Sequence, residues 1–296
     1  MRCSRCSKGL SSAQSNWIWV LCLVSLLACF PALAEAPVDS DAVVDIVQMP
    51  AWVERGGRRE PLAPGKALQN RDKVFTGRDA RVLIQLADGS TVKLGENAEL
   101  HLNLLGRRAD SGLAGALEIV RGAFRLTPGK TPGQSVFNVR IATITAGTRN
   151  ADLWGSAHAE GDLVCSLEGQ VMVLHEREES RYLSEPLSCY FAANGAAPRL
   201  IDDVDRSKVR LCVEQTEIQP GRGFVQRGGL WGAHLMTLES EDRALRLYDQ
   251  ARAAGYAASI QPTRVKRKVY QYTVSVAQAP TRDEAQALAA RLRSTL

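Results

Sequence analysis

Hydrophobic and polar residues alternate most regularly between residues 81 and 94, and the alternation is interrupted once. The apolar positions are Val82, Ile84, Leu86, Val92 and Leu94. Period-two alternation predicts two strands, each with one apolar face, and Asp88-Gly89-Ser90 between them predicts a hairpin turn. Facing residues of an antiparallel pair share a side of the sheet, so the apolar faces coincide if Leu86 faces Val92 and Ile84 faces Leu94. A three-residue turn over residues 88–90 gives this register.

The segments that follow this hairpin repeat the same kind of pattern. Strands are expected at residues 99–102, 115–120, 122–126 and 137–145, with Gly, Pro and Asn enriched between them. Many short strands separated by turn residues are typical of all-β domains. We therefore expect an all-β fold here, of the β-roll, sandwich or β-helix type, and periodicity does not choose among the three.

The pattern changes to a helical period near residue 240. A strand is expected at Trp231–Leu238, followed by a helix that Ser240 caps. Two more strands, near residues 257–260 and 269–276, precede a second helix that begins at the capping box Thr281–Glu284. This order predicts an α+β unit whose helices cover one face of a sheet. The apolar stripe of the first helix is Ala244, Leu247, Tyr248 and Ala251.

The N-terminus carries the pattern of an export signal. Basic residues at positions 2, 5 and 8 precede an apolar run from Trp17 to Phe30, and Ala32-Leu33-Ala34 then supplies a cleavage site. The run is shorter than the roughly 20 residues that a transmembrane helix needs. We therefore expect cleavage after Ala34 and a periplasmic mature protein; a retained anchor and lipidation of Cys29 are the alternatives.

Positive charge gathers at the C-terminal end of the chain. The formal net charge is +5, of which three basic residues belong to the signal. Residues 227–296 contain eleven Lys and Arg against six Asp and Glu, whereas residues 35–226 have an acidic balance. The C-terminal segment is thus suited to an anionic partner. Nucleic acid is not expected as that partner, because the chain is exported.

Three cysteines remain after the signal is removed. Cys165, Cys189 and Cys212 are widely spaced and odd in number, which permits one disulfide and one free thiol in an oxidising compartment. The equally good alternative is that all three are small buried strand residues.

The sequence contains none of the local motifs of common catalytic or cofactor sites. Its four histidines, at positions 101, 158, 175 and 234, have no metal-ligand spacing, and nucleophile elbows, phosphate loops and dinucleotide fingerprints are missing. We expect neither enzyme activity nor a metal or other cofactor.

A run of motifs in the β-rich part resembles the FecR domain in its usual order. The resemblance covers about residues 45–176, and it implies fold more than function, because its glycines and Asn97 suit turns. FecR proteins that regulate sigma factors also have a cytoplasmic domain and a transmembrane helix, which this sequence does not show. The matching positions are Leu62, Gly65, Leu68, Asp72, Val74, Thr76-Gly77, Arg81-Val82, Leu86, Asp88-Gly89-Ser90, Leu94-Gly95, Asn97, Gly122, Gly147-Thr148, Glu168-Gly169 and Val171.

Residues 228–296 resemble a SPOR domain. The resemblance rests on Trp231, His234-Leu235, Leu238, Ala244, Ala254-Gly255-Tyr256, Tyr272, Val274, Val276, Ala285, Leu288 and Leu292. It implies an α+β, ferredoxin-like fold that binds peptidoglycan, preferring glycan strands stripped of stem peptides at division sites. The chain departs from the family pattern at His234, where Gln is usual, and at Met236, where a small residue is usual. The fourth strand is also missing.

The missing strand would leave residues 231–238 as an open sheet edge. Residues 209–217 alternate roughly and precede a Pro/Gly-rich turn, so we hypothesise that they form a strand antiparallel to residues 231–238. The expected organisation is a signal peptide at 1–34, a leader at 35–44, a FecR-like domain at 45–176, a β extension and linker at 177–227, and a SPOR domain at 228–296.

Glycan binding is expected on the face of the SPOR sheet that the helices leave open. In the third strand, Tyr270, Tyr272, Val274 and Val276 are expected to be core, and the alternating residues polar and open. Ala233 and Leu235 are expected to face the helices. Hydroxyl and amide groups suit sugar hydroxyls, and basic side chains suit muramic acid carboxylates. The expected site comprises His234, Thr237, Gln271, Thr273 and Ser275, with Arg264, Lys266, Arg267 and Lys268.

Two functions follow from these expectations. In the first, the SPOR domain holds the protein on septal peptidoglycan and the FecR-like domain is a spacer or partner-binding module. In the second, the protein is an envelope sensor whose FecR-like domain binds a partner protein, and the SPOR domain only localises it.

Overall fold

The structure is a computed structural model that describes residues 40–108, 112–130, 135–176, 178–201 and 205–296. The expected signal peptide and the first five residues of the expected leader lie outside these ranges. Among the described residues, no helix has both the length and the apolar character needed to cross a bilayer.

Residues 40–201 are built from β-strands. Their bounds are β1 Ala42–Gln48, β2 Ala51–Arg55, β3 Arg58–Pro61, β4 Ala67–Leu68, β5 Lys73–Thr76, β6 Arg81–Leu86, β7 Thr91–Leu94, β8 Glu99–Arg107, β9 Leu113–Thr127, β10 Val136–Ile141, β11 Ile144–Arg149, β12 Asp152–His158, β13 Gly161–Glu168, β14 Val171–His175, β15 Arg181–Leu183, β16 Cys189–Ala193 and β17 Arg199–Ile201. The expectation of an all-β fold for this part is confirmed at the level of strand content.

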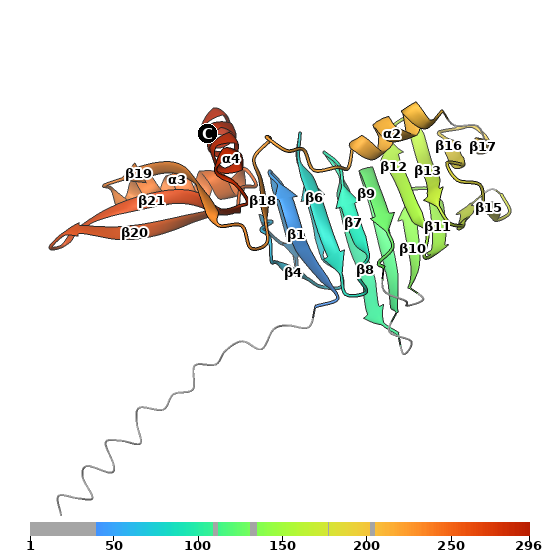
Figure 1. The fold of residues 1–296 in the computed structure, drawn as a ribbon, viewed down its shortest axis with the longest axis horizontal. Coiled ribbons are helices and arrows are strands. Elements are labelled where there is room, and N and C mark those ends of the chain that lie inside the picture. Colours follow the sequence, from blue (N-terminus) through green and yellow to red (C-terminus); the bar gives the residue numbers. More distant parts are fainter. Residues whose placement is uncertain (1–39, 109–111, 131–134, 177, 202–204) are drawn as a thin grey trace, which may run out of the picture. The chain divides into compact units, whose positions relative to one another are not determined.

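These strands form two ladders that share β9. In one ladder, β1, β6, β7, β9, β12, β13, β16 and β17 are neighbours in that order, and Figure 1 shows β1, β6 and β7 side by side. In the other, the order is β3, β2, β5, β8, β9, β10, β11, β14 and β15. Apolar residues of both ladders belong to one buried cluster, so the two layers share a core.

Strand β9 combines two segments that the pattern separates. Residues 113–119 pair with β8 and β10, and residues 122–127 pair with β7 and β12. Gly122, between them, has a φ of +83°, a conformation that is strained for other residues. Its Cα hydrogen faces Ala98 so closely that a Cβ would lie 2.6 Å from the Ala98 Cα. The predicted strand 137–145, in contrast, is a hairpin of β10 and β11.

The β6–β7 hairpin differs from its predicted register by two residues. Ile84 faces Val92 and Val82 faces Leu94, so the loop comprises Ala87, Asp88 and Gly89. The loop has the predicted length, and a two-residue shift keeps the same side chains on the buried face, so alternation cannot distinguish the two registers. Asp88 accepts hydrogen bonds from the Ser90 N–H and hydroxyl, at 2.9 and 2.7 Å, and fixes the observed one.

The segment between the two domains contains a helix where a strand is expected. Helix α2 spans Arg206–Glu214, and the Asp205 side chain caps it by accepting from the Ser207 N–H. Only Val209 of this helix is buried, so the short alternation of Val209, Leu211 and Val213 has no sheet behind it. The hypothesis that residues 209–217 pair with residues 231–238 is therefore wrong. A three-residue strand, β18 Phe224–Gln226, follows and pairs with β1.

The C-terminal part has the predicted order of elements. They are β19 Trp231–Leu238, α3 Glu241–Ala253, β20 Ala258–Lys266, β21 Val269–Ala279 and α4 Arg282–Thr295, and the sheet order is β19-β21-β20. Ser240 and Thr281 cap the two helices as predicted, accepting from the N–H groups of Arg243 and Glu284. Gly255, with φ +86°, ends the first helix. The stripe of α3 packs inward, with Ala244 and Ala251 fully buried.

Among the described residues, β19 pairs only with β21, so no fourth strand covers its other edge. Helix α4 lies along this edge, and the Arg293 guanidinium donates to the His234 carbonyl at 3.3 Å. Trp231, Arg282, Gln286 and Arg293 are among the residues that line a groove of about 320 Å³ there. Side chains of α4 thus partly cover the edge that the sequence leaves open.

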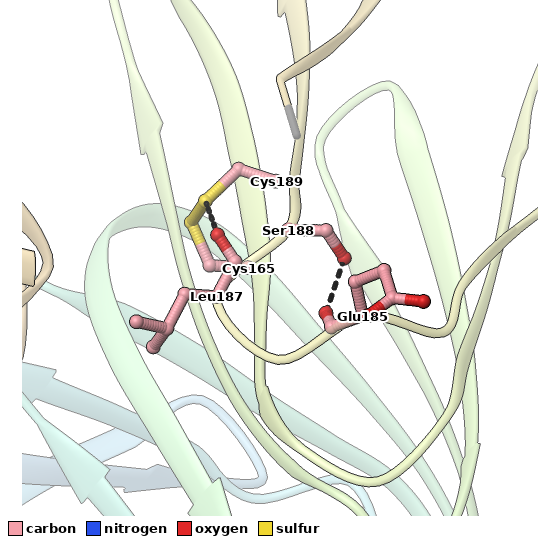
Figure 2. The surroundings of a disulfide bond; sticks show 5 residues. All are labelled: Cys165, Glu185, Leu187, Ser188 and Cys189. Carbon is pink, nitrogen blue, oxygen red and sulfur yellow. Dashed lines mark hydrogen bonds between the residues drawn. A yellow bond between two sulfur atoms is a disulfide. The ribbon is translucent and has the colours of Figure 1, made fainter. Parts of the chain in front are cut away.

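A disulfide joins Cys165 of β13 to Cys189 of β16, which face each other across the two strands. Figure 2 shows this bridge beside the turn that leads into β16, where the Ser188 hydroxyl donates to the Glu185 carbonyl at 2.7 Å. Cys212 of α2 is the free thiol and packs against the same small apolar cluster. Of the two alternatives for the three cysteines, the structure therefore contains one disulfide and one free thiol.

Candidate functional site

Strand β21 has the predicted division into a buried and an open side. Val274 and Val276 are fully buried, and Tyr272 packs against the core and donates to Glu241 at 3.0 Å. This hydrogen bond raises the pKa of Tyr272 and attaches the strand to α3. Tyr270 was predicted as core but is 44% exposed, because it lies at the hairpin end of the strand, opposite Arg264.

Strand β19 places His234 and Thr237 on the open side of the sheet. Ala233 and Leu235 are buried as predicted. The strand has a bulge between His234 and Met236, so residues three positions apart reach the same face. His234 Nε2 lies 2.9 Å from Thr237 Oγ1, which lies 3.1 Å from Thr273 Oγ1 on β21. Three side chains from two strands thus form one hydrogen-bonded row.

Gln271 and Ser275 extend this row along β21. Ser275 faces His234 across the strands, and Thr273 faces Thr237. The structure therefore places the five uncharged site residues predicted from the sequence on a single face. Their hydroxyl, amide and imidazole groups both donate and accept hydrogen bonds, as recognition of sugar hydroxyls requires.

Sequence reasoning predicted a strand at the start of β20 but missed the polar residues that β20 adds to this face. Ser259, Gln261 and Thr263 of β20 lie directly opposite Ser275, Thr273 and Gln271, so they share the open side, and all three are exposed. The predicted strand ended at Ile260, before Pro262. Proline is tolerated on an edge strand, which β20 is. The polar residues at alternate positions 259, 261 and 263 were the available signal.

The four predicted basic residues lie at the hairpin end of the same two strands. Arg264 and Lys266 belong to β20, and Arg267 and Lys268 form the turn to β21, with Lys268 at φ +62°. All four are exposed, and none forms an ion pair with a described carboxylate. The structure thus places a positive hairpin tip beyond the polar row, with Arg264 and Lys266 on a strand and Arg267 and Lys268 in the turn.

A buried carboxylate joins helix α4 to the linker loop that precedes β18. Glu284, at the start of α4, accepts hydrogen bonds from the N–H groups of Gly221, Gly223 and Phe224. The predicted capping box has its Thr281 half, but the Glu284 side chain binds the linker loop instead of returning to Thr281. Gly223 has φ +76°, and a Cβ there would lie 2.5 Å from the Leu288 N atom. The loop therefore packs closely against α4.

The arrangement suits the binding of a polar ligand. The polar row contains no cysteine or carboxylate, and no group of three or more metal-ligating side chains occurs among the described residues. A flat, hydrogen-bonding sheet face with a cationic end is a surface for an extended, polar and partly anionic ligand.

Comparisons with known proteins match both parts of the chain. The family described as FecR protein matches residues 72–172, and the family described as SPOR domain matches residues 228–296. No curated protein matches the chain.

Solved structures also match the chain. Two crystal structures, at 1.65 and 2.50 Å resolution, are of a putative anti-sigma factor from Parabacteroides distasonis ATCC 8503. The first is 15% identical and covers 62% of this chain and 75% of its own, with a TM-score of 0.40. The second is 16% identical and covers 75% of this chain and 91% of its own, with a TM-score of 0.40.

Proposed function

Because the chain carries a FecR domain followed by a SPOR domain, we propose that it is an exported envelope protein that binds the glycan strands of peptidoglycan. SPOR domains bind peptidoglycan. For this chain we propose a particular ligand and a particular binding face. The ligand is the denuded glycan strand at division sites, and the surface is the open side of the β19-β21-β20 sheet. The mature protein is periplasmic, and the FecR domain is its spacer or partner-binding module.

The observation that carries this proposal is the row of His234, Thr237 and Thr273. Their side chains bond to one another across two strands and are fixed by the bulge and the cross-strand register. A ligand that meets preoriented donors and acceptors loses less conformational entropy on binding than one that must order them. With Ser259, Gln261 and Thr263 the row becomes a polar surface three strands wide.

The basic hairpin tip supplies positive charge that can pair with the carboxylates of a denuded strand. Removal of stem peptides leaves a carboxylate on each muramic acid, and Arg264, Lys266, Arg267 and Lys268 have no competing carboxylate among the described residues. Charge-assisted hydrogen bonds to such carboxylates are stronger than those to neutral sugars. The tip can therefore pair with the carboxylate that each muramic acid of a denuded strand exposes on the glycan itself.

The test is co-sedimentation of the mature chain with purified sacculi, with and without amidase treatment. The whole chain is used because the linker loop and α4 hold each other through Glu284. We expect amidase treatment to increase pelleting. The triple variant His234→Ala, Gln271→Ala, Thr273→Ala should bind about a hundredfold more weakly, since each of the three lost hydrogen bonds is worth about 1 kcal/mol.

A matched triple variant controls for general effects of three alanines. Arg246→Ala, Asp249→Ala and Gln250→Ala lie on the exposed side of α3, on the helix-covered side of the sheet. This variant should pellet like the wild type. Equal pelleting of both triple variants, or negligible pelleting of the wild type on treated and untreated sacculi, would exclude the assigned face.

A second function is favoured by one observation on the FecR domain. Met172 and Leu174 of β14 and Tyr182 of β15 are exposed, and Met172 faces Tyr182 across the strands. Three large apolar side chains on one sheet face suit a protein partner, as in an envelope sensor. Site-specific crosslinking from position 172 in the periplasm tests it; a partner captured by the wild type and lost in Leu174→Glu supports the sensor function.

A further inference from the structure

The FecR domain contains a pocket that the glycan-binding proposal does not use. Its volume is about 570 Å³, within the range of small-molecule sites. Six separate segments of the chain line it: the start of β6, the turn after β7, the middle of β9, the turn after β10, the β12–β13 hairpin, and the residue that ends α2. Its polar side chains are Arg81, Glu96, Asn97, Arg121, His158, Asp162 and Gln215.

Arg81 is a buried cation in this pocket without a carboxylate in contact. It is only 7% exposed, its Nη1 donates to the neighbouring Ala80 carbonyl at 2.7 Å, and its Nε has no hydrogen-bond partner among the described residues. Burial lowers the pKa of Arg81, and the charges of Glu96 and Asp79 oppose this without forming an ion pair with it. Burying an unpaired charge is costly, so the site favours an anion that can pair with it.

The two carboxylates that line the pocket are engaged elsewhere. Asp162 accepts from the Thr143 N–H and hydroxyl at 2.9 and 2.6 Å, and Glu96 accepts from the Asp79 N–H at 2.7 Å. These bonds hold the turn after β10 and the turn before β6, so neither carboxylate is free to move to Arg81 without breaking them. Arg81 thus remains without an ion pair, although Glu96 and Asp162 place negative charge on the wall of the pocket.

We propose that this pocket binds the carboxylate group of a small ligand or peptide end, with Arg81 as its principal donor. The planar guanidinium matches a carboxylate through two parallel hydrogen bonds. A phosphate or sulfate dianion fits less well, because Glu96 and Asp162 also line the pocket and would repel its second charge. These same two carboxylates favour a ligand that carries an N–H group beside its carboxylate.

The test measures binding to the mature chain by isothermal titration calorimetry with four probes. They are acetate, N-acetylglycine, its neutral amide and inorganic phosphate. We expect N-acetylglycine to bind and its amide not to bind, because only the acid carries the charge that Arg81 lacks. Acetate tests the carboxylate alone, and stronger binding of N-acetylglycine than of acetate identifies a peptide-like source.

Arg81→Met is the decisive variant. Methionine fills a similar volume without charge, so the fold should be retained, and affinity for N-acetylglycine should fall at least about tenfold, as expected for a lost charged hydrogen bond. Arg58→Met, on an exposed strand, is the matched control and should bind like the wild type. Arg81→Lys keeps the charge without the planar fork and should bind more weakly than the wild type.

Three results would overturn the proposal. They are equal affinity of acid and amide for the wild type, equal affinity of Arg81→Met and wild type for the acid, and tighter binding of phosphate than of N-acetylglycine. If Arg81→Met does not fold, the acid and amide comparison on the wild type still decides, since it needs no variant. None of these outcomes depends on pelleting with sacculi, so this proposal and the glycan-binding proposal fail separately.

Discussion

Asp72 in the FecR domain and Glu284 in the SPOR domain are both buried carboxylates, but different partners stabilise their charge. Asp72 is fully buried and receives two hydrogen bonds from Arg55, at 2.8 and 2.6 Å, and one from the Gln69 N–H. Glu284 is nearly as buried and receives three backbone N–H groups, with no cation in contact among the described residues.

The difference shows how each region fixes its loops. The Arg55 pair joins β2 to the turn before β5 through two side chains, so it depends on a second charged residue. Glu284 instead uses the backbone of residues 221–224, whose two glycines with positive φ turn their N–H groups toward it. An ion pair fixes a side chain to a side chain, whereas the backbone site fixes the path of the chain itself. Substitutions at four positions test how the partners of a carboxylate determine its contribution to stability.

The largest effect is expected for Asp72→Ala. It leaves the Gln69 N–H and the Arg55 guanidinium, whose side chain is 37% exposed, without their charged acceptor, and should lower the free energy of unfolding by about 4 kcal/mol for the three lost hydrogen bonds. The measurement is urea denaturation followed by circular dichroism. Adding Arg55→Met should recover part of the loss. A double variant as unstable as Asp72→Ala would show that the unpaired cation is not the cause.

Glu284→Ala should destabilise by about 3 kcal/mol, because three N–H groups lose a charged acceptor. Glu284→Gln should cost only about 1 kcal/mol, since the amide oxygen can still accept from Gly223 and Phe224. Asp72→Asn should show less rescue, because it also removes the negative charge that pairs with Arg55. Equal losses for the amide variants at both positions, again in urea, would remove the proposed distinction.

Tyr190→Phe tests a third way of satisfying a carboxylate, by a neutral donor. The Tyr190 hydroxyl lies 3.2 Å from Glu178 Oε2, and burial together with this hydrogen bond raises the pKa of Tyr190 to about 12. An acid with a raised folded pKa stabilises the fold below its unfolded pKa, near 10, and this stabilisation is lost as pH rises to 12.

The wild type should therefore lose more stability than Tyr190→Phe between pH 10 and 12. At pH 7 the variant should be less stable by about 1 kcal/mol, for the lost hydrogen bond. Thermal denaturation at a series of pH values measures the gap, which should close as the pH rises. A constant gap over this window would contradict the assignment to Tyr190.

The smallest effect is expected for Glu217→Gln. Glu217, in the linker, pairs with Lys93 at 2.6 Å and with Arg125 at 3.1 Å, but its side chain is 38% exposed. Partly exposed pairs are screened, so the loss should be about 0.5 kcal/mol and should vanish in 1 M salt. The loss in Asp72→Ala should persist at that salt concentration. A salt-independent loss at Glu217 would contradict this ranking by exposure.

The SPOR sheet could be predicted because its strands bury one face and expose the other, which gives the sequence a regular alternation. Ala233, Leu235, Val274 and Val276 alternate with polar residues, and burying them on one side determines where the others point. The bulge after His234 could not be predicted, because a bulge adds a residue without changing the composition. The bulge brings Thr237 to the same face as His234.

Predictions failed where local pattern competes with distant contacts. Val209, Leu211 and Val213 alternate like a strand, but only Val209 finds a core, and the Asp205 cap favours the helix. The β6–β7 register is ambiguous by two residues until the Asp88 side chain is placed. The Arg81 pocket was not predicted at all, since its residues come from six separate segments of the chain and no local motif marks them.

The pairing of β18 with β1 has a consequence for folding kinetics. Val47 lies opposite Val225, so β1 receives one of its neighbours from the segment directly before the SPOR domain. A chain synthesised from its N-terminus completes this pairing only after residues 224–226 have emerged. Until then, the backbone of Ile46–Gln48 is an open edge that can pair with another chain. Delayed arrival of residues 224–226 would thus be a source of aggregation during biogenesis.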